Sequence, residues 1–170
     1  MQTAAMLVAV GILSIIAYGD IRTRRIPNAL SVAIATLGLI RITLAHDPVA
    51  AAHTFAAAAA IFIIALLLFW RGAIGGGDAK LVAAMALLIG YHDLVGFLFL
   101  MSLCGGALAL AILARDKLRL RLRRFSRPAG MRSLKIPECI APAAPSTVPY
   151  GLAIAAAGAI TLILEASLAR

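Results

Sequence analysis

Gly75-Gly76-Gly77-Asp78-Ala79-Lys80 separates two strongly apolar runs, and the rest of the chain is interpreted outward from it. Upstream, residues 50–70 contain one histidine and no Asp, Glu, Lys or Arg; downstream, residues 81–91 contain no charge. The three glycines allow close backbone approach and positive φ angles. A charged side chain at membrane depth costs about 3 kcal/mol on insertion scales, so such residues generally serve a function. The partner that we expect for Asp78 is Asp20.

The composition is that of a membrane protein. The chain has 170 residues, of which 63% are hydrophobic and 14% charged. A soluble domain is closer to half apolar and a quarter charged. The net charge is +9, and the basic residues lie beside the apolar runs. This arrangement favours membrane orientation and contact with anionic lipid over nucleic-acid binding. We therefore predict an all-α polytopic membrane helix bundle, with residues 1–170 forming a single transmembrane domain.

Six apolar segments are predicted to span the membrane: residues 2–18, 29–45, 49–70, 79–91, 94–114 and 150–168. Asn28 is expected to cap the second span, because its side chain can accept from the first backbone N–H groups of a helix. The first span lacks a preceding basic region, unlike a secretory signal, so we expect it to be retained. The fourth span is short, since a helix over residues 78–91 measures roughly 21 Å against a hydrocarbon core of about 30 Å.

The basic residues predict the orientation of these spans. Of sixteen Lys and Arg residues, three follow the first span, two flank the glycine stretch and nine lie in residues 115–135. With six spans, these three connections lie on one side, which the positive-inside rule makes cytoplasmic. Both termini are then outside. The basic and Pro-rich segment 115–149 is predicted to be a cytoplasmic loop between the fifth and sixth spans.

Asp20 and Asp78 form a candidate catalytic pair. Of the seven acidic residues, only these two combine a position at the cytoplasmic end of a span with an adjacent glycine. Two carboxylates that share a site do not both ionise easily, so the pair holds one proton. The ionised member can deprotonate a water molecule while the protonated member polarises a peptide carbonyl. This chemistry is that of an aspartic protease, and it requires no metal and no cofactor.

Three segments carry a resemblance to the type IV prepilin peptidases. Residues 75–80 resemble the Gly-x-Gly-Asp motif of that family, with Gly75, Gly77, Asp78 and Lys80 in register. Residues 19–28, in which Asp20 precedes basic residues and Ile-Pro-Asn, resemble its first-aspartate segment, and residues 148–154 resemble the start of its last helix. The resemblance implies an intramembrane aspartic endopeptidase of the bacterial inner membrane, with Asp20 and Asp78 catalytic and facing the cytoplasm. Gly75, Gly77 and Lys80 would then contact the substrate.

The implied partners are membrane lipid and the N-terminal helix of a prepilin or a pilin-like (pseudopilin) precursor of secretion machinery. Larger members of the family carry an N-terminal extension with paired cysteines and also methylate the new N-terminus. This chain has no Cys-x-x-Cys and resembles the short members that serve tight-adherence (Flp-type) pili. Methyltransferase activity is therefore doubtful.

Simpler interpretations exist for each of these residues. Asp78 can serve only as a partner for the N-terminus of the next helix. Asp20 can neutralise Arg22 or Arg24 at the interface. Lys80 can extend its ammonium group to the membrane surface without touching a substrate. We interpret Cys104 and Cys139 as unpaired, since two cysteines make no disulfide framework.

Other function classes also remain open at this stage. An ion- or proton-coupled transporter could use the aspartates as a relay, which predicts polar residues continuing across the bilayer. In a non-enzymatic scaffold, replacing either aspartate by asparagine would have no effect. Presenilin-like and signal-peptide-peptidase proteins share the glycine-aspartate feature, but they lack the first-aspartate segment found here.

Overall fold

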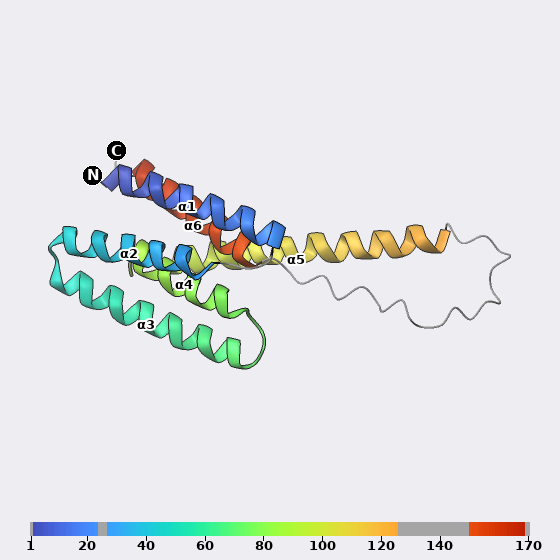
Figure 1. Cartoon of the computed structure of the whole chain (residues 1–170), viewed down its shortest axis with the longest axis horizontal. Helices are drawn as coiled ribbons and strands as arrows, with labels where there is room; N and C mark the ends of the chain where they lie inside the picture. Colours follow the sequence, from blue (N-terminus) through green and yellow to red (C-terminus); the bar gives the residue numbers. More distant parts are fainter. Residues whose placement is uncertain (1, 24–26, 126–149, 169–170) are drawn as a thin grey trace. The chain divides into compact units, whose positions relative to one another are not determined.

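The computed structural model describes residues 2–23, 27–125 and 150–168, and every regular element within them is an α-helix (Figure 1). The helices are α1 (Gln2–Thr23), α2 (Asn28–Ala45), α3 (Pro48–Trp70), α4 (Gly76–Ile89), α5 (Leu94–Phe125) and α6 (Tyr150–Leu168). The all-α class predicted from the sequence is confirmed. Cys139 and most of the Pro-rich segment lie outside the described residues.

The chain divides into two compact units. The first unit, Met1–Gly105 with Pro149–Arg170, contains α1 to α4, the beginning of α5, and α6. The second unit, Gly106–Val148, contains the remainder of α5. The candidate functional residues all belong to the first unit. A single transmembrane domain over the whole chain stays a prediction.

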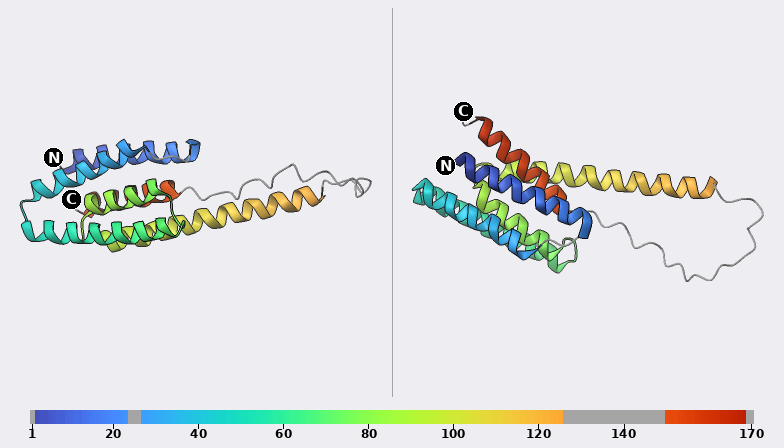
Figure 2. Two further views of the ribbon diagram at one scale, coloured as in Figure 1. Left: turned by 60° about the horizontal axis from the view of Figure 1, so that its bottom comes forward. Right: turned by 45° about the horizontal axis from the view of Figure 1, so that its top comes forward.

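Helix α4 is the most buried helix of the first unit. Eight of its fourteen residues are buried, and it packs against α2, α3 and α6. Helices α1 and α6 lie side by side, as do α2, α3 and α4, in the views of Figures 1 and 2. Apolar side chains from all of these helices, such as Leu13, Ile34, Met85 and Leu162, form the core. The ends of α4 are consequently held by its neighbours on several sides.

Local sequence explains where several helices begin and end. Asp47 caps α3, since its carboxylate accepts from the backbone N–H groups of Val49 at 3.0 Å and Ala50 at 3.1 Å. Pro48 occupies the first turn, where its missing N–H costs nothing. Gly90 follows α4 with a φ of 86°, a conformation that suits glycine. Asp47 and Pro48 thus set the start of α3, and Gly90 sets the end of α4.

Within the described residues, four helices are long and apolar enough to cross a membrane: α2, α3, residues 94–119 of α5, and α6. Their large apolar side chains are extensively exposed, among them Val32, Ile63, Leu103 and Ile163. Such faces suit a lipid environment. By length and composition these helices suit a membrane protein, whereas the arrangement with six membrane spans stays a prediction.

The structure corrects several predicted boundaries. Asn28 is the first residue of α2, and Pro27 takes the N-cap position. Helix α4 begins at Gly76, so Gly76 and Gly77 are helical, and the positive φ in this region belongs to Gly72 at 71°. Packing overrides the weak helix propensity of glycine here. Helix α5 continues past the expected end at residue 114 to Phe125, because Arg, Lys and Leu are strong helix formers.

Candidate active site

Asp20 lies in the last two turns of α1 and is only 6% exposed. Its carboxylate oxygen Oδ2 accepts a hydrogen bond of 2.9 Å from the backbone N–H of Leu152. Leu152 is in the first turn of α6, where backbone N–H groups have no partner within the helix and the helix dipole favours negative charge. Asp20 therefore joins α1 to the start of α6. Of the two arginines in the simpler interpretation of Asp20, Arg22 donates to the Tyr18 hydroxyl at 2.9 Å, and Arg24 lies outside the described residues.

Asp78 is the third residue of α4, and Gly75 is the N-cap of that helix. The Asp78 carboxylate accepts a hydrogen bond from the backbone N–H of Gly75. It thus fills the helix-terminus role that the sequence had suggested as an alternative. A Cβ atom at position 75 would lie 3.2 Å from Asp78 Oδ2. Glycine at this position therefore leaves room for the carboxylate.

The second glycine of the stretch has a separate steric reason. A Cβ atom at position 76 would lie 3.2 Å from Cε2 of Phe69, in the last turn of α3. Gly77 lies in the same first turn of α4, directly before Asp78. Gly76 therefore allows α4 to start close against the end of α3.

The fold brings Asp20 and Asp78 into electrostatic range of each other. They come from different helices, 58 positions apart in the sequence. Asp20 is bound to the first turn of α6, and α6 packs against α4, whose first turn carries Asp78. Both carboxylates thus lie at helix N-termini in one region of the bundle. Two carboxylates that interact electrostatically in this way can hold a single proton as a pair.

Lys80 points elsewhere. Its Nζ donates to the side-chain oxygen of Asn28 at 3.2 Å, which links α4 to the start of α2. Residues two positions apart on a helix project about 200° apart, so Lys80 and Asp78 leave α4 on different faces. Lys80 also lines a groove of about 430 Å³ together with Ser31 and Phe62. The structure therefore groups Asp20, Asp78 and Gly75, and it directs Lys80 toward α2.

Across residues 2–23, 27–125 and 150–168, no group of three or more His, Cys, Asp or Glu side chains could hold a metal ion. Cys104 is a free thiol. The absence of a metal or cofactor stays a prediction.

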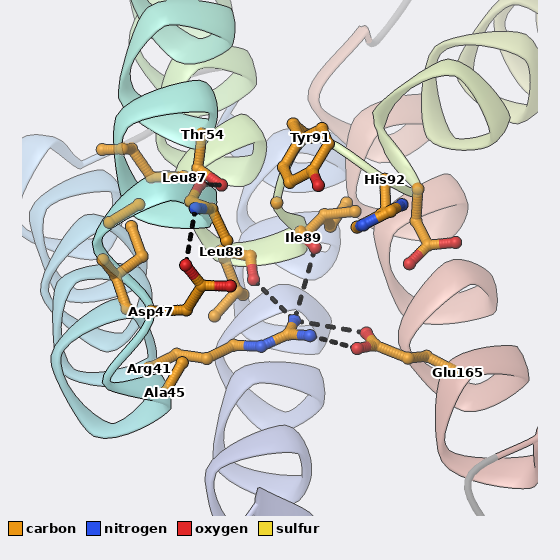
Figure 3. A pocket seen from close by; sticks show the side chains of 15 residues that line it. Arg41, Ala45, Asp47, Thr54, Leu87, Leu88, Ile89, Tyr91, His92 and Glu165 are labelled. Atoms are coloured by element: carbon orange, nitrogen blue, oxygen red, sulfur yellow. Dashed lines mark hydrogen bonds and ion pairs between the residues drawn. The ribbon is translucent and has the colours of Figure 1, made fainter.

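An ion pair that was not predicted from the sequence lies near the opposite end of α4. Arg41 of α2 donates through both terminal nitrogens to the carboxylate of Glu165 in α6 (Figure 3). Its Nη1 also donates to the backbone oxygen of Leu88 at 2.8 Å and lies 3.5 Å from that of Ile89. The pair borders a cavity of about 340 Å³. A signal was available, because Arg41 is the one charged residue of α2 and Glu165 the one charged residue of α6.

The backbone N–H that donates to Asp20 could not be predicted from the sequence, for a different reason. Leu152 acts through its backbone N–H, so no residue type in the sequence marks it. The resemblance of residues 148–154 to the start of a family helix was the available clue. In the folded chain, the backbone N–H of Leu152 at this helix start holds the Asp20 carboxylate in place.

Part of the chain that includes both aspartates matches a known protein family. The model of the type IV leader peptidase family matches residues 7–110, which is more than half of the chain. The matched region contains Asp20, the glycine stretch and Asp78. No curated protein and no solved structure matched the chain.

Proposed function

Since the chain belongs to the type IV leader peptidase family, we propose that it is an intramembrane aspartic endopeptidase in which Asp20 and Asp78 act as a pair. The observation that supports this role is the convergence of the two carboxylates. Each one is held by a backbone N–H at the start of a helix, Leu152 for Asp20 and Gly75 for Asp78. Fixed donors keep a carboxylate oriented without a flexible side-chain partner, which is the preorganisation that catalysis requires.

In this mechanism the pair carries one proton. The ionised carboxylate accepts a proton from a water molecule as the water oxygen bonds to the carbonyl carbon of the scissile peptide. The protonated carboxylate donates to the carbonyl oxygen, so that a neutral tetrahedral intermediate forms. The C–N bond then breaks while the first carboxyl group returns its proton to the leaving amine and the second regains its own. The enzyme ends in its starting state, and no covalent adduct with the protein is needed.

The proposed substrate is a prepilin or pilin-like precursor with a basic leader, a glycine and an apolar N-terminal helix. The extensive apolar surface of the bundle suits an apolar helical substrate that approaches within the bilayer. The proposed topology has six spans in the bacterial inner membrane, with the pair on the cytoplasmic side, because fourteen of sixteen basic residues lie in the connections on that side. We propose that the activity of this chain is that of the short Flp-type members of the family, which is cleavage of the precursor without methylation of the new N-terminus.

The other predicted contact residues receive separate roles. Gly75 and Gly77 are proposed to let the substrate backbone approach Asp78. The bond from Lys80 to Asn28 favours a structural link between α4 and α2 over a substrate contact.

Co-expression with a candidate precursor tests the activity. The wild-type chain, Asp20→Asn and Asp78→Asn are each expressed with the precursor, and the N-terminus of the pilin is determined by mass spectrometry. Asp93→Asn is the matched control, because Asp93 is an exposed acid beyond the C-terminal end of α4. We expect cleavage by the wild type and the control and none by the other two. An uncut precursor with wild-type enzyme would contradict the proposal and would leave the transporter interpretation as its successor.

A further inference from the structure

Arg41 and Glu165 form an ion pair between two helices that are otherwise uncharged. α2 and α6 are both apolar enough to cross a membrane, and each contains one charged residue. The side chains are 25% and 20% exposed. Charges within apolar spans are costly, and they face the interior of the bundle and pair with one another. This pairing therefore selects one specific arrangement of α2 against α6.

The guanidinium of Arg41 also holds the C-terminal end of α4. It donates to the backbone oxygen of Leu88 at 2.8 Å and reaches that of Ile89 (Figure 3). These are among the last carbonyls of α4, which have no partner within the helix and carry the negative end of its dipole. Arginine suits this position because its planar group offers five donors in a fixed geometry. One side chain thus joins α2, α4 and α6.

A glycine one turn earlier in α2 brings Arg41 within reach of these carbonyls. A Cβ atom at Gly38 would lie 2.8 Å from the backbone nitrogen of Leu88 and 2.9 Å from the carbonyl carbon of Leu87. The backbones of α2 and α4 therefore approach closely at this point, as small residues allow between membrane helices. Residues three apart lie on the same side of a helix, so the approach at Gly38 also sets the position of Arg41.

The same two helices, α4 and α6, carry the candidate catalytic pair at their other ends. Asp78 is in the first turn of α4, and the N–H that holds Asp20 is in the first turn of α6. Ten residues separate Asp78 from Leu88, which corresponds to roughly 15 Å along α4. Arg41 donates hydrogen bonds near the C-terminal ends of both helices. It is therefore too far from Asp78 and Asp20 to contact the reacting atoms.

We infer that Arg41 and Glu165 are positioning residues, which fix α4 relative to α6 and thereby set the separation of Asp78 and Asp20. The inference rests on the proposed function. Rigid helices transmit a displacement from one end to the other, and a misplacement of about 1 Å at a catalytic centre can cost about a hundredfold in rate. Loss of this three-helix contact should therefore lower kcat and leave substrate binding intact.

The test uses full-length enzyme in detergent with one precursor substrate. The variants are Arg41→Met, Arg41→Lys and the double variant Arg41→Met/Glu165→Met, with Asp93→Asn as the matched control near the same end of α4. The single methionine variant leaves Glu165 without its partner, which can impair folding by itself. The double variant removes both charges, and replacing a shielded ion pair by apolar residues is often neutral or stabilising. Each preparation is measured for kcat, KM and thermal unfolding.

We expect the double variant to unfold at or above the wild-type temperature, with kcat lowered at least tenfold and KM within twofold of wild type. Arg41→Lys should have an intermediate kcat, because lysine keeps the charge and loses the forked geometry. The control should match wild type. A double variant with wild-type kcat would overturn the inference, as would a raised KM with unchanged kcat, which would make Arg41 a substrate contact. If the wild type fails to cleave, the proposed function fails with it; if the wild type cleaves and the double variant cleaves equally well, only the positioning role fails.

Discussion

At the scale of single residues, each candidate catalytic carboxylate has a structural role beside the chemical role proposed for it. Asp20 binds the start of α6 and Asp78 binds the start of α4. The helix-terminus interpretation of Asp78 is therefore compatible with catalysis. The sequence could mark both aspartates as candidates, because a carboxylate beside glycine between apolar runs is costly and conspicuous. It could not predict the bond to Leu152, because every non-proline residue carries the same backbone donor.

Gly75 provides a prediction at this scale. Gly75→Ala would place a Cβ atom 3.2 Å from Asp78 Oδ2, so the carboxylate must shift by a few tenths of an ångström. We expect the cleavage rate to fall several-fold, because the Asp78 carboxylate is displaced. Thermal stability should fall only slightly, because alanine at a helix N-cap costs about 1 kcal/mol. The rate is measured on purified precursor. Gly96→Ala, where no atom lies within 4 Å of the added Cβ, is the control and should leave the rate unchanged. A Gly75→Ala enzyme as fast as the control would show that Asp78 tolerates the displacement.

At the scale of the elements, the predicted helices all exist, and the differences lie at their ends. Helix α4 starts at Gly76, three residues earlier than expected, because its start packs against Phe69. Helix α5 continues to Phe125 through residues whose charge suggested a loop. Hydrophobic patterning locates apolar segments well, but helix ends depend on packing and on intrinsic propensity. The contact between Arg41 and α4 forms only when α2 and α4 pack together. The sequence indicates it only through the isolated charges of Arg41 and Glu165 in otherwise uncharged helices.

The close approach of α2 and α4 gives a prediction for this scale. Gly38→Ala would force apart backbone atoms of α2 and α4, because the added Cβ would lie 2.8 Å from the nitrogen of Leu88. We expect the free energy of unfolding to fall by about 1–3 kcal/mol, the usual cost of overpacking. Thermal unfolding in detergent measures the loss. Gly11→Ala in α1 has open space around the added Cβ and should be neutral or slightly stabilising. Equal stability of the two variants would contradict the tight α2–α4 contact.

At the scale of the whole molecule, orientation in the membrane depends on charge distribution and not on packing. The same helix contacts form whichever side faces the cytoplasm, so the positive-inside rule carries the prediction. The prediction that fourteen of the sixteen basic residues lie on one side depends on six spans, including the short α4. At fourteen residues, α4 reaches about 21 Å, and its burial among α2, α3 and α6 allows an irregular chain to precede it.

Thiol accessibility checks this topology. Single cysteines are introduced as Lys117→Cys and Asp93→Cys into a chain whose two native cysteines have been replaced. We expect an impermeant thiol reagent to label Asp93→Cys in intact cells and to label Lys117→Cys only after the membrane is permeabilised. Labelling of Lys117→Cys in intact cells would contradict the six-span arrangement.

The most direct measurement of the central claim is the rate constant for cleavage of one precursor in detergent by wild type, Asp20→Asn, Asp78→Asn and the double variant. Asparagine keeps the size of aspartate but cannot exchange the proton. If the two carboxylates act as one unit, each single change lowers the rate at least about a thousandfold, and the double variant is no slower than either single variant. A metal chelator should not alter the wild-type rate, because the carboxylates themselves transfer the protons. Substantial cleavage by either single variant, a double variant with multiplied losses, or inhibition by the chelator would contradict the aspartic mechanism.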